Sequence, residues 1–590
     1  MIVRMKKIAL ITQAKDAQDA LKSLRSLGVV HVEHSQLPKN KDINLIQDDL
    51  SLINQALDVI LKAEFSVGRE GTLCRKDVTD WKAAARHIID TWKRIDHLQE
   101  FSKQLNSEIK EWGPWGDFDP NEVRKLAQKN IYLRLFQVPA KEMKNFPLAA
   151  RVSKIFTKGN VVYCAVFSRE KFECAFKEIG LPKMSLSQMR GRIAEDWRII
   201  ESLNDDLRSF FSYRTSLFQI KKSLEKELGF QEALGGMAQS KTLTYLCGFA
   251  PFDSETMLVS LAKKERWGLF ITDPGEDELV PTLIRNPGWV SIITPVFKLL
   301  EIVPGYRELD VSMLFLIFFS LFFGILIGDA GYGTTYLLIT FLAHKKLCKK
   351  YPNNKVFFLF YILSFCAIIW GALTGSFFGQ EWLVKAGIKP LMPSLNNTKN
   401  IQAFCFFLGA LHLSIAHSWR VILKLPSLTA LADIGWVLIL WAAFFFAKLL
   451  ILSQGLPFYA TWLLIAGMIL VVFFTNPRKN ILKAVGEGLG ALALSLMNNF
   501  TDVVSYVRLF AVGLAGVAIA DTFNSMAFSV GTGSVLAIIA SGFIIIAGHS
   551  LNLILGPMSV LVHGVRLNVL EFSGHANVTW SGVAYKPFKE

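Results

Sequence analysis

Residues 484–565 constrain this chain more than any other stretch, because they form a long, mainly apolar run with a single lysine or arginine, Arg508. One helical crossing of a bilayer takes about 20 apolar residues, so the stretch is long enough for two. An arginine at the centre of a bilayer costs about 2.5–3.5 kcal/mol on insertion scales and is found beside a carboxylate or a water-filled path. The stretch therefore predicts a buried, functional guanidinium. A structural arginine that is paired within its own bundle is an equally open interpretation.

The residues after Arg508 are small, and small residues allow another helix to approach closely. They are Ala511, Gly513, Ala515, Gly516 and Ala518. We therefore expect a second helix to pack against this face.

The apolar residues are concentrated in the second half of the chain. The composition is 52% hydrophobic, and the long apolar runs begin after Leu309, whereas the sequence up to Pro304 is charged and mixed. This division predicts a cytosolic domain at 1–300 and a membrane domain at 301–590. The net charge of +15 comes from helical faces and short loops, so we expect a lipid bilayer and no nucleic acid as partner.

The first half begins and ends with similar units. Residues 5–13, 14–28 and 29–35 read as strand, helix and strand, and the order recurs at 241–251, 253–266 and 267–273. This recurrence predicts small α/β lobes.

Two long helical stretches lie between these units, at about 43–112 and 185–228. Their apolar residues recur at steps of three and four, as at Ile193, Trp197 and Ile200. Because the two stretches bracket a globular piece at about 120–180, they predict a long antiparallel helical arm with a distal lobe at its tip and a proximal lobe at its base. A plain helical bundle fits the same pattern.

The sequence contains no feature typical of an active site. There is no GxxxxGK[ST] phosphate loop, no nucleophile–base set and no CxxC pair among the seven cysteines. We therefore expect no nucleotide site in this chain, no cofactor and no metal.

The second half predicts an α-helical polytopic membrane domain with about eight transmembrane helices. The expected spans are 311–328, 330–344, 356–378, 401–423, 428–453, 458–475, 485–530 and 534–570. The last two exceed the thickness of a bilayer, so we expect them to be long and tilted. Basic loops at 344–355, 417–424 and 476–483 alternate with loops that carry little charge. The positive-inside rule then places both termini in the cytoplasm.

Polar residues recur along the last span at steps that keep them on one broad helical stripe. They are His549, Asn552, Ser559, His563 and Arg566. Such a stripe indicates a hydrated ion path or, equally, interhelical hydrogen bonding.

Further polar side chains precede Arg508, and we add Glu487, Asp502 and Ser505 to the expected path. Asp502 lies six residues before Arg508, about 120° away around a helix. We therefore expect Arg508 to be free for a carboxylate of another subunit.

Several motifs resemble one family, the membrane stator subunit of V-type and A-type rotary ATPases, known as subunit a or subunit I. The motifs are "SYVRLFAVGLAG" (505–516), "GDAGYG" (328–333), "GALTGSFFG" (371–379), "LVHGVRLNVLEF" (561–572) and the connector "GEDELVPTLIRNPGW" with "VPGYRELD". The chain departs from the family pattern at Val311, where a proline is usual. It also has Gly516 where some relatives have His, and Gly556 where some have Glu.

The resemblance implies a stator subunit that provides two ion half-channels beside a ring of proteolipid subunits. Arg508 would be the essential cation facing the ring carboxylate, with Arg566 in the second arginine motif. The implied partners are the proteolipid ring, peripheral stalk subunits of the E/G type and a central-stalk adaptor. The implied location is the inner (plasma) membrane of a prokaryote.

The resemblance leaves open whether the ion is H⁺ or Na⁺, because the ring carboxylate belongs to another chain. A stand-alone transporter or channel with a regulatory cytosolic domain is the alternative function. It would need its own substrate site, commonly at an internal repeat, and no such repeat is visible.

Overall fold

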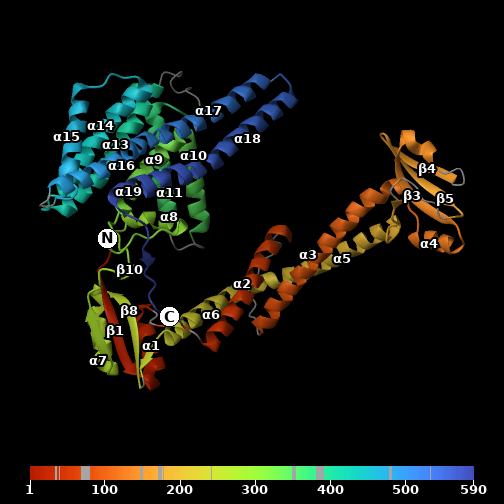
Figure 1. Ribbon diagram of the computed structural model, residues 1–590, viewed down its shortest axis with the longest axis horizontal. Coiled ribbons are helices and arrows are strands. Elements are labelled where there is room, and N and C mark those ends of the chain that lie inside the picture. Colours follow the sequence, from red (N-terminus) through yellow and green to blue (C-terminus); the bar gives the residue numbers. More distant parts are fainter. Residues whose placement is uncertain are drawn as a thin grey trace. The chain divides into compact units, whose positions relative to one another are not determined.

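The computed structural model (Figure 1) describes residues 1–33, 36, 38, 40–67, 80–146, 151–170, 176, 178–240, 242–348, 354–379, 391–477, 481–531 and 533–589. The chain forms two compact units. The first contains residues 1–11, 24–33 and 247–589, and the second contains residues 12–23 and 34–246. The predicted division at residue 300 falls within the first unit and stays a prediction.

The strands of the two strand–helix–strand segments, one at each end of the first half of the chain, share one five-stranded sheet. Its order is β2 (His31–Glu33), β8 (Leu243–Pro251), β1 (Met5–Gln13) and β9 (Gly268–Thr272), with β7 (Ala238–Ser240) also paired to β8. Helices α1 (Ala17–Leu27) and α7 (Glu255–Glu265) follow β1 and β8. The two strand–helix–strand segments therefore make one lobe and not two. A two-stranded unit is marginally stable alone, and pairing the units gives them a common core.

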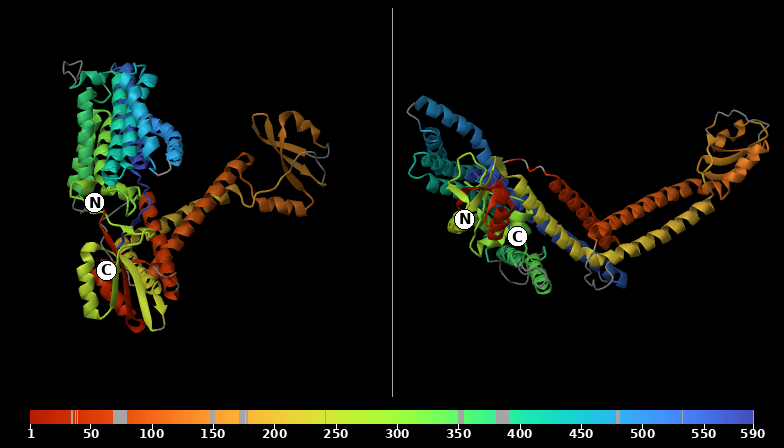
Figure 2. Two further views of the ribbon diagram at one scale, coloured as in Figure 1. Left: turned by 60° about the vertical axis from the view of Figure 1, so that its left-hand side comes forward. Right: turned by 90° about the horizontal axis from the view of Figure 1, so that it is seen from below.

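Four long helices make up most of the second unit. Helix α2 (Lys41–Val67) packs on α6 (Arg214–Gly235), and α3 (Trp81–Trp112) packs on α5 (Leu186–Phe210). Figure 2 shows α3 and α5 running side by side to the distal sheet. Their shared core is aliphatic and includes Ile53, Ile60, Ile88, Ile95, Ile200 and Leu207.

The predicted apolar stripe of α5 is wrong at Trp197, which is 56% exposed, whereas Asp196 is fully buried. The buried face is centred on Ile193, Asp196 and Ile200, at positions i, i+3 and i+7. Position i+4 then lies at the edge of this face.

The distal lobe is a four-stranded sheet of order β4 (Arg151–Lys158), β5 (Val161–Ser168), β3 (Tyr132–Pro139) and β6 (Glu178–Ile179). Every pairing in it is antiparallel. Trp112 and Trp115 at the end of α3 pack with Leu135 of β3 and Met189 of α5. This cluster joins the sheet to the helices, so the sheet forms at the predicted position of the distal lobe.

The rest of the first unit is helical. The helices are α8 (Thr294–Leu299), α9 (Ser312–Ile327), α10 (Ala330–Leu347), α11 (Lys355–Thr374), α13 (Thr398–Lys424), α14 (Ala430–Leu452), α15 (Phe458–Phe474), α16 (Ile481–Ser505), α17 (Val507–Val530), α18 (Val535–Ser559) and α19 (Ser573–Ala576). Consecutive helices pack together, as in α10–α11, α13–α14, α14–α15 and α17–α18. In Figure 1, α17 and α18 run as a pair oblique to α10 and α11.

Among the described residues, five helical segments are long and apolar enough to cross a membrane. They are Lys355–Thr374, Thr398–Lys424, Ala430–Leu452, Val485–Val530 and Val535–Ala576. The last two contain 46 and 42 residues, far more than one perpendicular crossing needs. Helices α9 and α15 are apolar but shorter, so a count of eight spans stays a prediction.

The turn between α9 and α10 is organised by Asp329, which is completely buried. Its carboxylate accepts hydrogen bonds from the backbone N–H groups of Gly331 and Tyr332, which caps α10. It also accepts bonds from the Ser376 hydroxyl and from the N–H groups of Phe378 and Gly379. Asp329 thus ties the turn between α9 and α10 to the segment that follows α11.

Candidate functional site

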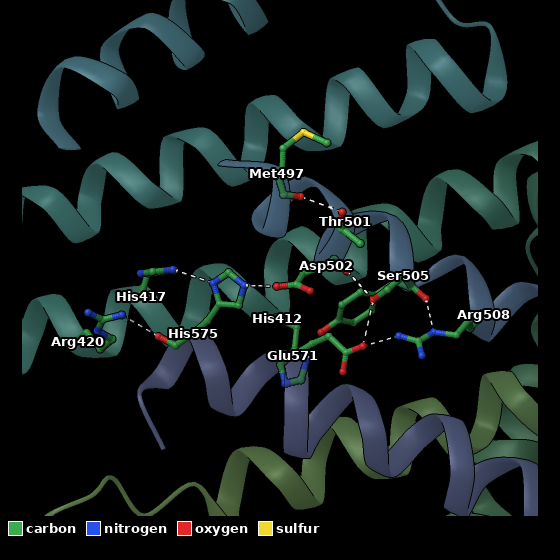
Figure 3. Close-up of polar contacts among 11 residues, drawn as sticks. His412, His417, Arg420, Met497, Thr501, Asp502, Ser505, Arg508, Glu571 and His575 are labelled. Carbon is green, nitrogen blue, oxygen red and sulfur yellow. Dashed lines mark hydrogen bonds and ion pairs between the residues drawn. The ribbon is translucent and has the colours of Figure 1, made fainter. Parts of the chain in front are cut away.

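Arg508 lies at the start of α17, directly after the break in the helix at Tyr506. Its Nε donates a hydrogen bond to the Ser505 carbonyl (3.0 Å), and its Nη2 donates to Oε1 of Glu571 (Figure 3). The Glu571 side chain is 6% exposed and the Arg508 side chain 22%. The prediction that Arg508 has no carboxylate partner in its own chain is therefore wrong. The partner is 63 residues away in sequence, beyond the reach of arguments from helical spacing.

Glu571 reaches Arg508 because the chain after α18 leaves the regular α-helical geometry. Two π-helical segments follow Pro557, at Val560–Gly564 and Leu567–Phe572. π-Helical segments are rare in proteins, and those that occur often lie at functional sites. They bring Arg566 to the same carboxylate, with its Nε 3.6 Å from Glu571 Oε1. The two predicted arginines therefore converge on one buried acid.

An open cavity of about 490 Å³ lies beside this acid. Its charged and titratable lining consists of His417, Arg420, Asp502, Arg566, Glu571 and His575. A cavity of this size and polarity can hold water. Asp502 and Arg566 were predicted as path residues, and the cavity brings them together.

Three site residues were not predicted from the sequence: Glu571, His575 and His417. Glu571 lies five residues after Arg566 in the motif "LVHGVRLNVLEF". Its place in that motif could have indicated a site residue. His575 and His417 offered none, because the sequence does not show that these two histidines, 158 residues apart, lie in contact.

The predicted polar stripe of the last span divides into two groups. Asn552 donates a hydrogen bond to the Gly516 carbonyl (2.8 Å), and Asn552 and Ser559 line a second cavity of about 300 Å³. His549 bonds to the Tyr332 hydroxyl (2.7 Å) and to Asn524 Oδ1 (3.1 Å).

By contrast, Arg566 lines the first cavity, and half-buried His563 lies on the π-helical turn that precedes it. The prediction of one polar stripe along the last span required 3.6 residues per turn throughout that span. The π-helical segments change that period, so one stripe became two groups.

Two further predicted path residues, Ser505 and Glu487, have different surroundings. The Ser505 hydroxyl donates to the Asp502 carbonyl (2.7 Å) and lies 3.5 Å from Glu571 Oε1, within the Arg508 cluster. Glu487 is exposed and accepts a hydrogen bond from the Asn476 side chain (2.9 Å). Of the two, only Ser505 belongs to the cluster around Arg508.

The small residues after Arg508 are used in two ways. Gly513 is buried, and a Cβ there would lie 2.6 Å from the Ile325 carbonyl oxygen, so α9 of the same chain occupies this position. Ala511, Ala515 and Ala518 remain exposed. Helix α17 therefore keeps an open face of small residues beside Arg508.

No protein-family model matches the chain, but curated relatives cover its full length. It is 32% identical over 615 residues to the V-type ATP synthase subunit I of Borreliella burgdorferi, with both chains covered completely. The chain belongs to the V-type ATP synthase subunit I family. It is 29% identical to subunit I 1 of Treponema pallidum, again with full coverage of both chains.

The relatives also include A-type proteins. The A-type ATP synthase subunit I of Methanocaldococcus jannaschii is 26% identical, with 71% of this chain and 68% of the relative covered. A crystal structure of the cytoplasmic N-terminal domain of a V-ATPase subunit I matches 45% of this chain and all of that one, with 14% identity and a TM-score of 0.23. That score is too low to carry a comparison of folds.

Proposed function

We propose that this subunit I is the membrane stator of a rotary ATPase and provides two ion half-channels beside a proteolipid ring. The first cavity and the second cavity lie on either side of Arg508 along the α16–α17 segment. The first is lined by Asp502 and Glu571, and the second by Ala511, Ala515 and Gly516. Two separate cavities flanking one arginine support offset half-channels.

Arg508 separates the two half-channels in this proposal. While no ring carboxylate is near, Glu571 neutralises the guanidinium. When rotation brings a ring carboxylate to the open face of α17, Arg508 stabilises its ionised form, because a nearby opposite charge favours ionisation. The ring carboxylate then releases its ion to one half-channel. A fixed cation between the cavities also repels ions that would leak directly across.

The cytosolic part would hold the stator still. Its long helices end at the distal sheet, which offers a docking site for peripheral stalk subunits of the E/G type, and the five-stranded lobe would contact the central-stalk adaptor. With eight spans and the basic loops inside, both termini are cytoplasmic. In a prokaryote the complex would occupy the inner membrane.

The Arg508–Glu571 pair beside an open face of small residues is the observation that carries this proposal. The test is ATP-driven ion pumping by complexes reconstituted in proteoliposomes. Arg508→Ala should abolish pumping, and Arg508→Lys should impair it severely, because lysine lacks the planar donor set and loses its proton more readily. Both complexes should retain the proteolipid and stalk subunits, since Gly513 still packs on α9. Near-normal pumping by an assembled Arg508→Ala complex would refute the proposal.

A further inference from the structure

Two histidines and two aspartates form a continuous hydrogen-bonded chain at the wall of the first cavity. His417 Nδ1 lies 3.2 Å from Asp433 Oδ1, His417 Nε2 lies 2.9 Å from His575 Nδ1, and His575 Nε2 lies 3.1 Å from Asp502 Oδ2. The last two contacts are drawn in Figure 3. The four residues come from α13, α14, α16 and α19, so only the tertiary structure assembles them. Asp433, His417 and His575 are buried, and Asp502 faces the cavity.

The number of protons in this hydrogen-bonded row of four residues follows from its geometry. Each hydrogen bond contains one proton, so three bonds between four groups need three. Two neutral imidazoles supply two, and ionised carboxylates supply none. The hydrogen-bonded row of four residues therefore holds one proton more than two neutral histidines and two ionised aspartates provide.

The position of the extra proton follows from the neighbouring charges. Arg420 Nη2 (3.2 Å) and Lys424 Nζ (2.6 Å) both contact the Asp433 carboxylate. Asp433 therefore stays ionised and accepts the Nδ1 proton of His417, which leaves His417 Nε2 as an acceptor. His575 must then donate from Nδ1, and the extra proton occupies the bond between His575 Nε2 and Asp502.

Another histidine of the membrane half, His549, has different hydrogen-bonding partners. His549 has two hydrogen-bond partners, but one is a hydroxyl and the other an amide oxygen. The Asn524 amide nitrogen donates to the Phe378 carbonyl, so its oxygen faces His549. A neutral imidazole satisfies both bonds, and His549 needs no extra proton.

We propose that His575 and Asp502 form the proton-exchange site of the first cavity, and that the transported ion is H⁺. This inference rests on the proposed half-channel. In the loaded site, His575 carries protons on both ring nitrogens and pairs with Asp502. In the exchange step the Nε2 proton passes to water in the cavity, which leaves a neutral imidazole and an ionised Asp502, and the reverse step reloads the site. His417 and Asp433 are positioning residues that fix the His575 tautomer.

The chemistry of the site favours a proton over a metal cation. Hard cations take oxygen ligands, whereas the acceptor here is an imidazole nitrogen. The charged and titratable groups around the pair come from α13, α14, α17 and the segment after α18: His417, Arg420, Lys424, Asp433, Arg508, Arg566 and Glu571.

The test is the pH profile of ATP-driven pumping in proteoliposomes of the full complex, with pH varied on the side of the soluble head. His575→Asn keeps a hydrogen-bonding side chain but cannot bind a proton. A positioned acid–base group typically contributes about 10²–10⁴-fold, and water in the cavity replaces much of this contribution, so we expect pumping about tenfold slower. The variant should also lose one ionisation from the profile. His344→Gln, at the end of α10 and bonded to Tyr361, is the matched control and should retain the profile.

The positioning role of His417 has its own test. His417→Gln presents an amide oxygen that can accept the His575 Nδ1 proton, so it should keep most of the profile, whereas His417→Leu should lose it. Equal profiles for these two variants would remove the positioning role.

An assembled His575→Asn complex with the wild-type profile would overturn the exchange site, and so would Na⁺-dependent pumping by the wild type. Either result is distinct from failure of the proposed half-channels, which only the Arg508→Ala complex reports.

Discussion

The pairing of Arg508 with Glu571 predicts a measurable energetic coupling. We consider Glu571→Gln, which keeps the volume and one acceptor oxygen but removes the charge. Breaking a buried ion pair by removing one partner costs about 3–5 kcal/mol. Arg508 keeps 22% of its side-chain exposure beside an open cavity. Because water there solvates part of the orphaned charge, we expect a loss of about 2–3 kcal/mol in the free energy of unfolding.

A double-mutant cycle isolates the pair from other effects of each substitution. Arg508→Gln alone, Glu571→Gln alone and the double variant would be compared with the wild type, with unfolding in mixed micelles titrated with SDS and followed by tryptophan fluorescence. We expect a coupling of about 1–2 kcal/mol, because removing both charges leaves neither one orphaned. Asp521→Asn, an exposed carboxylate on the same helix α17, should change stability by less than about 0.5 kcal/mol. A coupling no larger than that of the control would refute the pair.

Three further predictions concern topology, the second arginine motif and pH. With the other cysteines replaced, exposed Cys348 should resist a membrane-impermeant maleimide added outside intact cells, whereas a cysteine at Ser394 should react; the reverse pattern would contradict the orientation. His563→Ala should slow ion flux or shift its pH profile in an assembled complex, and unchanged flux and profile would make His563 structural. Burial raises the pKa of Glu308, but hydrogen bonds from Thr579 and from the backbone N–H groups of Gly305 and Trp580 together outweigh burial and hold this pKa below its usual value. A carboxyl with a lowered folded pKa stabilises above pH 4.5, the ordinary value of a free Glu, and this contribution disappears as pH falls through the folded pKa. Hydrogen-exchange protection of the Thr579 amide should therefore fall on acidification, and Glu308→Gln should remove that pH dependence.

The local elements were largely predictable from sequence. Period-two and helical patterns located β1, α1, β8 and the long helices of the second unit, and apolar runs located helices α9, α10, α11, α13, α14 and α15 within a few residues. The turn at Asp329 was equally accessible, because glycines flank an aspartate at a helix start. Each of these features depends on residues close together in sequence.

Errors arose where a prediction needed contacts between distant segments. The two strand–helix–strand units were assigned to separate lobes because a sequence does not reveal which strands pair. Trp197 was assigned to the buried face because a shift of one position around a helix moves a side chain from core to solvent. The polar stripe after Pro557 was extended with an α-helical period through segments that are π-helical.

The sequence by itself determined that Arg508 is a lone cation in an apolar stretch and that carboxylates and histidines lie elsewhere in the membrane half. Helical spacing decides neighbours only within about one turn. Only the tertiary structure decided that Glu571 meets Arg508 and that His417 and His575 link Asp433 to Asp502. The reason is that hydrogen bonds and ion pairs act over about 3–4 Å. A rotation of one helical position changes every such partner, and the packing of α13, α14, α16 and the π-helical segments sets that rotation.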